Sequence, residues 1–326
     1  MRHIFLINPA AGRGKAAAEL LPAILRAVKD KGVVYEIHRT VNTGDATRFV
    51  KDRCAHADGD RLRFYSVGGE GTLNEVLQGM MGDPNSEIAV IPAGTGNDFA
   101  RNFGERRDFL DIPAQLDGFL KPVDALKYEL LDQRGDDRLP SAGYAINMFN
   151  MGFDAEVAAT TGRMKRKPFL NGTAAYVAGV GAELTKLSGV DMTVEINGEP
   201  VASGDFLLAG AANGRFSGGG FDGSPLAVTD DGLMDVTLVR SMSRRLFLAI
   251  VKKYHDGTHY SDPRLDGVLT HYQCREAVFR PKEPMVMAVD GDTYTVGSVK
   301  FSIISGGVNL SLPVSLKEDD KEAEPQ

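Results

Sequence analysis

The sequence predicts two domains of different class, an α/β domain followed by an antiparallel β domain. In about the first 120 residues, apolar strand-like runs alternate with helical stripes, which is typical of a doubly wound parallel sheet. From about Asp124, strand-like runs separated by short turns dominate, which is typical of an antiparallel sandwich or open barrel. The chain has 326 residues, enough for two domains.

Four apolar runs predict the strands of the first domain, each joined to the next by a helix. HIFLIN is the first strand, and an apolar stripe from Ala17 to Val28 predicts a helix that contains Pro22, either bent there or in its first turn. VVYEIHR precedes a helix over TGDATRFVKDRCA, for which we expect Thr43 or Asp45 near the N-cap. The third strand is RLRFYSV, and the helix after it carries Leu73, Val76, Leu77 and Met80. The fourth strand is the continuously apolar EIAVIPAG, of the kind that is buried on both faces of a sheet.

Eight runs predict the strands of the second domain. They are ALKYELL, GYAINMF, VDMTVEI, GDFLLAGAANG, LMDVTLV, EAVFRP, PMVMAVDG and VKFSII. Turn sequences such as NGE, DDG and DGD separate several of them. Helical insertions are expected at about 172–187 and 243–254. No repeat and no flexible linker marks the boundary, so the change of period alone places it.

Composition and charge exclude several classes of protein. A formal net charge of −7 argues against a general nucleic-acid-binding protein. Two cysteines are too few for a disulfide framework or a zinc site. The chain has no apolar run of about 18 residues, so a membrane role has to be peripheral. We expect a cytoplasmic protein that associates with the inner face of the membrane, with a disordered acidic tail at 317–326.

Three glycine-containing loops follow predicted strands, at 8–15 (NPAAGRGK), 68–75 (GGEGTLNE) and 92–101 (PAGTGNDFAR). Because the carboxyl ends of parallel strands share one edge of a sheet, the three loops are expected to open at the same edge. Glycine permits a close approach of the backbone to a ligand, and a helix N-terminus binds anions. A P-loop is excluded because Ala16 stands where Ser or Thr is needed, and no loop has the dinucleotide fingerprint. A phosphate site of another type remains, beside the alternative of simple turns.

Six motifs together resemble the diacylglycerol kinase catalytic family and its bacterial soluble lipid kinases in their order and spacing. They are NPAAG, GGEGTLNEV, PAGTGNDFAR, NMGFDAEV, DDGLMDV and VDGD, and the resemblance covers roughly 3–312. It implies an ATP-binding α/β domain at 1–124, a β-sandwich at 125–302 and an active site in the cleft between them. The return of the last strand, about 303–316, to the first domain stays open.

The resemblance implies ATP- and Mg²⁺-dependent phosphorylation of a lipid hydroxyl, in the first place that of diacylglycerol, giving phosphatidic acid. Two alternatives stay open. One is a kinase for another lipid alcohol, such as a sphingoid base, phosphatidylglycerol or a prenol. The other is a non-catalytic nucleotide-binding regulator with the same fold.

The resemblance also places residues at the nucleotide. They are Asn8, Pro9, Ala10, Ala11, Gly12, Thr40, Gly68, Gly69, Glu70, Gly71, Thr72, Leu73, Asn74 and Thr95. Glu70 departs from the aspartate that is usual in the family, which keeps the charge and lengthens the side chain by one methylene. That difference leaves the role of Glu70 open.

Two acidic turns in the second half match the metal and catalytic motifs. LAVTDDGLMDV maps the carboxylate ligand of a structural Mg²⁺ to Asp231, and carbonyl ligands to Val228 and Leu233, although DDG is also a hairpin-turn signal. VDGD maps the general base to Asp292, where the family has glutamate. Asp290 is the neighbouring carboxylate, which acts on the metal or shares the base role, so the assignment between the two stays open.

A basic cluster predicts where the protein meets a membrane. Arg163, Lys165, Arg166 and Lys167 suit anionic headgroups, whereas a solvated loop is the alternative. RRLFLAIVKKYH (244–255) is interpreted as a packing helix. The expected partner is a lipid alcohol presented at a membrane surface. A homodimer is compatible with the sequence, and no nucleic-acid partner is expected.

Overall fold

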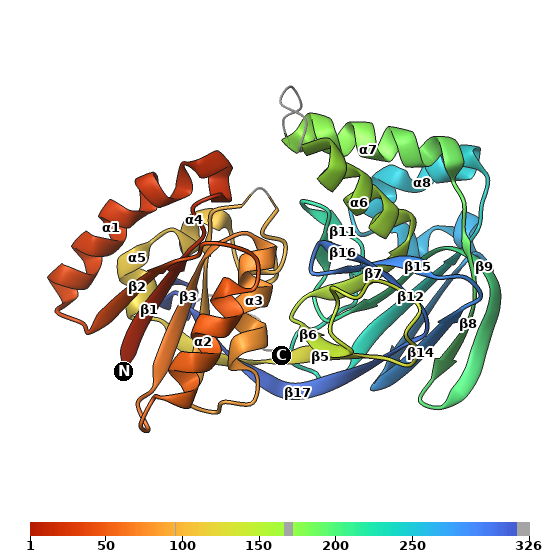
Figure 1. The fold of residues 1–326 in the computed structure, drawn as a ribbon. Helices are drawn as coiled ribbons and strands as arrows, with labels where there is room; N and C mark the ends of the chain where they lie inside the picture. Colours follow the sequence, from red (N-terminus) through yellow and green to blue (C-terminus); the bar gives the residue numbers. More distant parts are fainter. Residues whose placement is uncertain (95, 166–171, 318–326) are drawn as a thin grey trace, which may run out of the picture. The chain divides into compact units, whose positions relative to one another are not determined.

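The computed structural model describes residues 1–94, 96–165 and 172–317, and it divides into two compact units (Figure 1). The first unit comprises Met1–Val123 and the segment from Gly306 onward, and the second comprises Asp124–Ser305. Thr95, Arg166, Lys167 and the predicted tail after residue 317 lie outside the described residues. None of the described helices is long and apolar enough to cross a membrane.

The first unit is built on a parallel sheet. Its strands lie in the order β2-β1-β3-β4-β17. Their bounds are Arg2–Ile7 (β1), Tyr35–Arg39 (β2), Leu62–Gly68 (β3), Ser86–Pro92 (β4) and Val299–Leu312 (β17). β17 contributes its C-terminal end here, where Leu310 and Ser311 pair with Ile88 and Ala89. Every residue of β3 and β4 is buried, as expected for inner strands of a sheet covered on both faces.

Helices pack on this sheet in two groups. α1 (Ala16–Lys31) and the short α5 (Ile112–Leu116) share an apolar core with Phe5, Tyr65 and Ile91 of the strands. α2 (Asp45–Ala55) packs closely on α3 (Glu70–Met80). Shorter helical turns are η1 (Ala11–Gly14), η2 (Ala100–Asn102), α4 (Arg106–Phe109) and η5 (Val314–Lys317). α1 is continuous through Pro22, so the predicted helix is present with the proline in its interior.

The N-cap of α2 lies between Thr43 and Asp45, the two residues expected near it. Gly44 occupies the cap in the left-handed conformation, at φ 79°, and neither Thr43 nor Asp45 supplies a capping side chain. Instead, Glu75 of α3 accepts hydrogen bonds from the backbone N–H groups of Gly44 (2.9 Å) and Ala46 (3.1 Å). A carboxylate from the neighbouring helix therefore satisfies donors that a local side chain usually takes.

The second unit is an antiparallel β domain. Its main strand order is β16-β15-β7-β9-β8-β14-β17, with β12 pairing β9 and β13, and β5 pairing β6. The bounds are Phe119–Leu130 (β5), Ala142–Ala145 (β6), Met148–Gly152 (β7), Val190–Ile196 (β8), Glu199–Ala212 (β9), Met234–Arg240 (β12), Leu269–Cys274 (β13), Glu276–Pro281 (β14), Met285–Val289 (β15) and Asp292–Val296 (β16). β10 (Phe216–Ser217) and β11 (Phe221–Asp222) form a separate ribbon.

The core of this unit contains stacked and edge-to-face aromatic rings. The ring centroid of Phe301 lies 4.4 Å from that of Phe149 and 5.5 Å from that of Phe279. All three side chains are fully buried. Each of the eight predicted runs contains a strand, whereas β13 and β16 were not predicted.

Three helices belong to the second unit. They are α6 (Phe153–Lys165), α7 (Gly172–Lys186) and α8 (Arg244–His255), with the helical turns η3 (His259–Ser261) and η4 (Pro263–Leu265) after α8. α7 and α8 confirm the two predicted helical insertions. α6 was not predicted, because its buried Phe153, Ala155 and Val157 alternate as in a strand.

Candidate functional site

The carboxyl ends of the first four strands carry the glycine-containing loops of the first unit. These strands are parallel neighbours, so Asn8 after β1, Thr40 after β2 and Gly69 after β3 share one edge of the sheet. The loop after β4 joins the same edge, because the N–H groups of Ala93 and Gly94 donate to the Gly68 carbonyl at 2.8 and 3.1 Å. The loops that the sequence placed together are therefore together.

Asn8 links the first loop to α3. Its Nδ2 donates to Oγ1 of Thr72 (3.0 Å), and its Oδ1 accepts from the N–H of Ala10 (2.9 Å). The second bond is an Asx turn, which shapes the loop after β1. The amide of Asn8 thus holds the loop after β1 in place.

Glycines at this edge allow close backbone contacts. A Cβ at Gly68 would lie 2.3 Å from Oγ1 of Thr72, and a Cβ at Gly94 would lie 2.8 Å from Cα of Gly69. Both positions therefore require glycine. Gly69 differs, because a Cβ there would be 3.6 Å from Cα of Gly94, an ordinary contact. Gly69 is the N-cap of α3 and brings no capping side chain to the helix N-terminus, where backbone N–H groups and the helix dipole favour an anion.

Glu70 joins α3 to the loop after β4. Its Oε1 accepts from the N–H of Asp98 at 3.1 Å, and a Cβ at Gly96 would lie 3.1 Å from its Oε2. The extra methylene of glutamate therefore serves a contact with the neighbouring loop. This is a structural role for the residue that departs from the usual aspartate.

The other residues predicted to bind the nucleotide differ in their exposure to solvent. Pro9, Ala10 and Gly12 are exposed, and Gly12 has φ 58°. Leu73 is only 4% exposed and belongs to the core, so its side chain does not face a ligand. Ala11 begins η1, and the N–H of Thr40 donates to the Ile7 carbonyl. Gly71 and Thr72 are in the first turn of α3. The side chain of Asn74, also in α3, accepts a hydrogen bond from Gln78. Thr95 is outside the described residues.

Asp290 of the second unit is a clamp on the backbone. Its buried carboxylate accepts from the N–H groups of Ile146 (2.9 Å), Asn147 (3.0 Å) and Met148 (3.1 Å). Its own N–H donates to the Met148 carbonyl, and its φ of 45° lies in the left-handed region. Asp290 therefore fixes the segment between β6 and β7 against the β15–β16 turn.

Asp292 lies two residues further on and is exposed. It begins β16 and pairs with Val289 across the hairpin. Of the two carboxylates in this turn, Asp292 is the one that reaches the surface of the unit. Asp290 therefore has a structural role in this turn, whereas Asp292 is its exposed carboxylate.

Asp231 lies in a turn that is rich in carboxylates. Its Oδ1 accepts from the N–H of Leu233 (2.9 Å), while Oδ2 of Asp124 accepts from the N–H of Gly232 (2.7 Å). Partial burial raises the pKa of Asp231, and the negative charges of Asp235, Asp124 and Asp230 raise it further. A cation near Asp231 would relieve this repulsion.

The donor set around Asp231 fits magnesium in kind. Mg²⁺ takes hard oxygen ligands and commonly keeps several waters, so one carboxylate and the carbonyls of Val228 and Leu233 are chemically suitable. Among the residues that the structure describes, no group of three or more His, Cys, Asp or Glu side chains is arranged to hold a metal. The magnesium assignment therefore rests on Asp231 and the charge around it.

Asp231→Asn is expected to lower the midpoint of thermal unfolding, Tm, in millimolar MgCl₂ but not in EDTA. Asparagine keeps an acceptor for the Leu233 N–H, so the turn is preserved. In EDTA the substitution removes a repelled charge, whereas in MgCl₂ it removes a metal ligand. Scanning calorimetry in both buffers measures the difference. Equal shifts in the two buffers would leave Asp231 with a turn role only.

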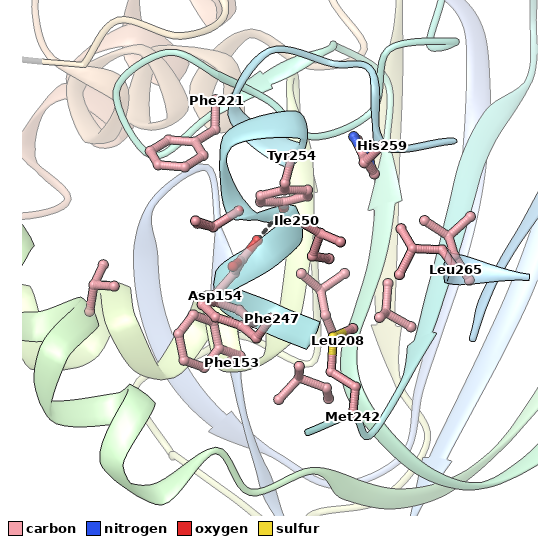
Figure 2. Close-up of a pocket in the computed structure, with 15 residues that line it drawn as sticks. Phe153, Asp154, Leu208, Phe221, Met242, Phe247, Ile250, Tyr254, His259 and Leu265 are labelled. Carbon is pink, nitrogen blue, oxygen red and sulfur yellow. Dashed lines mark hydrogen bonds between the residues drawn. The ribbon is translucent and has the colours of Figure 1, made fainter. Parts of the chain in front are cut away.

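The second unit also contains an apolar pocket, with an empty volume of about 650 Å³ that includes the space at its opening (Figure 2). Its walls come from α6, α7, α8, β9, β12 and β13. The polar groups at its lining are Asp154, Tyr254 and His259. Sequence analysis missed this pocket, because its lining is spread from Phe153 to Leu269 and forms no local motif.

Comparisons with known proteins agree with the two-unit organisation. Residues 2–128 match the diacylglycerol kinase catalytic domain, and residues 147–312 match the YegS C-terminal NAD kinase beta sandwich-like domain. Two similar curated proteins are both named "Probable lipid kinase YegS-like". The one from Alcanivorax borkumensis is 28% identical over 289 residues, covering 87% of this chain and 89% of the relative. The one from Stenotrophomonas maltophilia is 26% identical over 291 residues, covering 87% and 89%.

A similar solved structure is the crystal structure of a diacylglycerol kinase from Bacillus anthracis. It has a TM-score of 0.67 at 18% identity and covers 97% of this chain and 98% of the other. At that identity the likeness shows the fold. The predicted fold class, an α/β domain followed by an antiparallel β-sandwich, is confirmed.

Proposed function

The chain belongs to the diacylglycerol kinase catalytic family with a YegS-type C-terminal sandwich, and on this premise we propose that it is an ATP- and Mg²⁺-dependent lipid kinase. One observation carries the proposal. Glycine-built loops meet at the carboxyl edge of the parallel sheet, beside the N-terminus of α3 that Gly69 caps. Such an edge suits the phosphates of a nucleotide.

In the proposed reaction, the oxygen of a lipid hydroxyl attacks the γ-phosphorus of ATP, and the bond to the β–γ bridging oxygen breaks to release ADP. Asp292 accepts the hydroxyl proton. Phosphoryl transfer depends mostly on positioning and on charge stabilisation. The glycine loops and α3 hold the phosphates, while Asp290 positions the turn that carries Asp292. Asp231 would hold a structural Mg²⁺, and bound Mg²⁺ would supply the positive charge on which phosphoryl transfer depends.

Diacylglycerol is the substrate that we propose first, with phosphatidic acid as the product. The family match and the names of the relatives support a lipid acceptor. Other lipid alcohols, including sphingoid bases, phosphatidylglycerol and prenols, are the runner-up substrates. A nucleotide-binding regulator without catalysis is the alternative from a different class.

Lipid-dependent formation of ADP tests the proposal. The purified protein is incubated with ATP and MgCl₂, with and without diacylglycerol in mixed micelles. We expect ADP to accumulate only when the lipid is present, because the acceptor is its hydroxyl. A protein that binds ATP but forms no ADP with any of the four lipid classes above would be the regulator.

Binding to anionic vesicles is expected to depend on the basic cluster and to weaken as salt rises. Exposed charges are screened over about 8 Å at physiological ionic strength. Arg163 lies in α6 and donates to Oγ1 of Thr160, one turn earlier in the same helix, at 2.5 Å. Changing Arg163, Lys165, Arg166 and Lys167 to glutamine should therefore abolish most vesicle binding, measured by co-sedimentation with phosphatidylglycerol vesicles.

A matched control removes the same number of positive charges elsewhere. Four exposed cations of the first unit serve for this, namely Lys29, Lys51, Arg106 and Arg107. Their change to glutamine is expected to leave vesicle binding nearly unchanged. Equal losses in the two variants would mean that net charge, and not the cluster, governs the contact.

A further inference from the structure

A carboxylate lies among the apolar walls of the pocket in the second unit. Asp154, the second residue of α6, points into the pocket, and the Tyr254 hydroxyl of α8 donates to its Oδ2 at 2.6 Å (Figure 2). Among the described residues that line the pocket, Asp154 is the one acidic residue, and the others are mostly aliphatic or aromatic. The lining also contains His259, whose ring is edge-on to that of Tyr254 with the centroids 4.9 Å apart.

The carboxylate of Asp154 has capacity for further donors. An ionised carboxylate offers about four acceptor positions. Among the described residues, the hydroxyl of Tyr254 is the hydrogen-bond donor to it. Burial raises the pKa of Asp154 to about 6, since the apolar surroundings disfavour the charged form. A ligand that donates a hydrogen bond to Asp154 would therefore offset part of the free-energy cost of burying this carboxylate.

His259 does not supply a positive charge to this carboxylate. Burial lowers the pKa of its ring to about 4, so the imidazole is neutral at pH 7. No Lys or Arg is found among the lining residues within the described parts of the chain. The pocket thus offers a ligand a negatively charged hydrogen-bond acceptor, the carboxylate of Asp154, among mostly apolar side chains.

We propose that this pocket binds an aliphatic chain that carries a hydroxyl group, and that the hydroxyl donates a hydrogen bond to Asp154. The apolar walls, among them Phe153, Leu207 and Phe247, suit the chain. A neutral hydroxyl suits the carboxylate better than an ammonium does, because a second buried charge adds its own desolvation cost.

The identity of the natural ligand as a hydroxylated lipid rests on the proposed function. The binding of an alcohol in the pocket does not, since all lining residues belong to the second unit. The test therefore uses simple probes and requires no catalysis.

Titration calorimetry with 1-decanol and with decyl methyl ether separates the hydroxyl from the chain. The ether has the same chain and lacks the donor. We expect the wild-type protein to bind 1-decanol about tenfold more tightly than the ether, the ratio for one hydrogen bond to a charged group. Asp154→Ala should bind both probes with the affinity of the ether.

Two further variants keep the test decisive. Asp154→Asn keeps the shape of the side chain and an acceptor for Tyr254, so it is expected to fold, and loss of the charge should reduce the preference severalfold. Asp266→Asn is the matched control, because Asp266 is exposed, follows η4 and is not part of the lining. It should keep the wild-type preference.

Equal affinities of the wild-type protein for alcohol and ether would overturn the proposal, and so would a preference that survives in Asp154→Ala. Binding of neither probe would also overturn it. Failure of the kinase proposal is recognised separately, since a protein that prefers the alcohol but forms no ADP with lipid keeps this pocket and loses the proposed reaction.

Discussion

Asp292→Asn is expected to lower kcat by about 10²–10⁴-fold, the usual contribution of general-base catalysis, while ATP still binds. Asp292 is exposed at the start of β16, so the change removes a base without disturbing the core. Single-turnover phosphorylation and ATP titration calorimetry measure the two quantities. Asp292→Glu restores the usual residue of the family and should keep turnover at or above the wild-type level.

Asp290→Asn is the comparison that separates the base from its support. Its carboxylate accepts from three backbone N–H groups, and an amide has only one oxygen for them. We therefore expect Asp290→Asn to have a lower Tm and a lower kcat than the wild type, whereas Asp292→Asn should have a lower kcat and an unchanged Tm. A folded Asp290→Asn with low turnover, beside a normal Asp292→Asn, would reverse the roles. Normal turnover in both would place the base elsewhere.

Gly69→Val is expected to raise the Kd for ATP about tenfold or more, which corresponds to about 1.4 kcal/mol. The added side chain would stand at the N-terminus of α3, where the proposed phosphates approach the backbone. A Cβ at this position meets Gly94 Cα at an ordinary 3.6 Å, so Gly69→Ala should fold normally and give a smaller loss. ATP titration calorimetry together with thermal unfolding tests this.

Gly68→Ala is the matched comparison for stability. Its Cβ would lie 2.3 Å from Oγ1 of Thr72, so this variant should lose Tm first. If Gly69→Val folds and binds ATP as the wild type does, the nucleotide does not lie at this edge.

The α/β half was predictable because its signals are local. β3 and β4 are buried along their whole length and rich in apolar residues, and α3 carries its apolar stripe in one short segment. Prediction failed where a contact joins distant residues or where a pattern is ambiguous. The hydrogen bonds from the start of α2 to Glu75, which lies on another helix, were not predicted. α6 was missed because buried residues alternate at its start, which resembles a strand.

In the candidate site too, local features were predictable from the sequence and contacts between distant residues were not. The loops were found from glycines that follow strands, and the resemblance supplied the individual residues. The clamp made by Asp290 was not predictable, because its partners at 146–148 are more than 140 positions away. Leu73 was placed among the nucleotide residues by its motif, although its side chain serves the core. The contact of Glu70 with Asp98 likewise needs the fold of both loops.

Transfer of labelled phosphate from [γ-³²P]ATP to a panel of lipid alcohols tests the central claim most directly. The panel contains diacylglycerol, a sphingoid base, phosphatidylglycerol and a prenol, with the wild-type protein and Asp292→Asn assayed in parallel in MgCl₂. The account predicts a labelled lipid phosphate from the wild-type protein, most abundant with diacylglycerol and lost with Asp292→Asn. Absence of label in every lipid, from a protein that binds ATP under the same conditions, would contradict it.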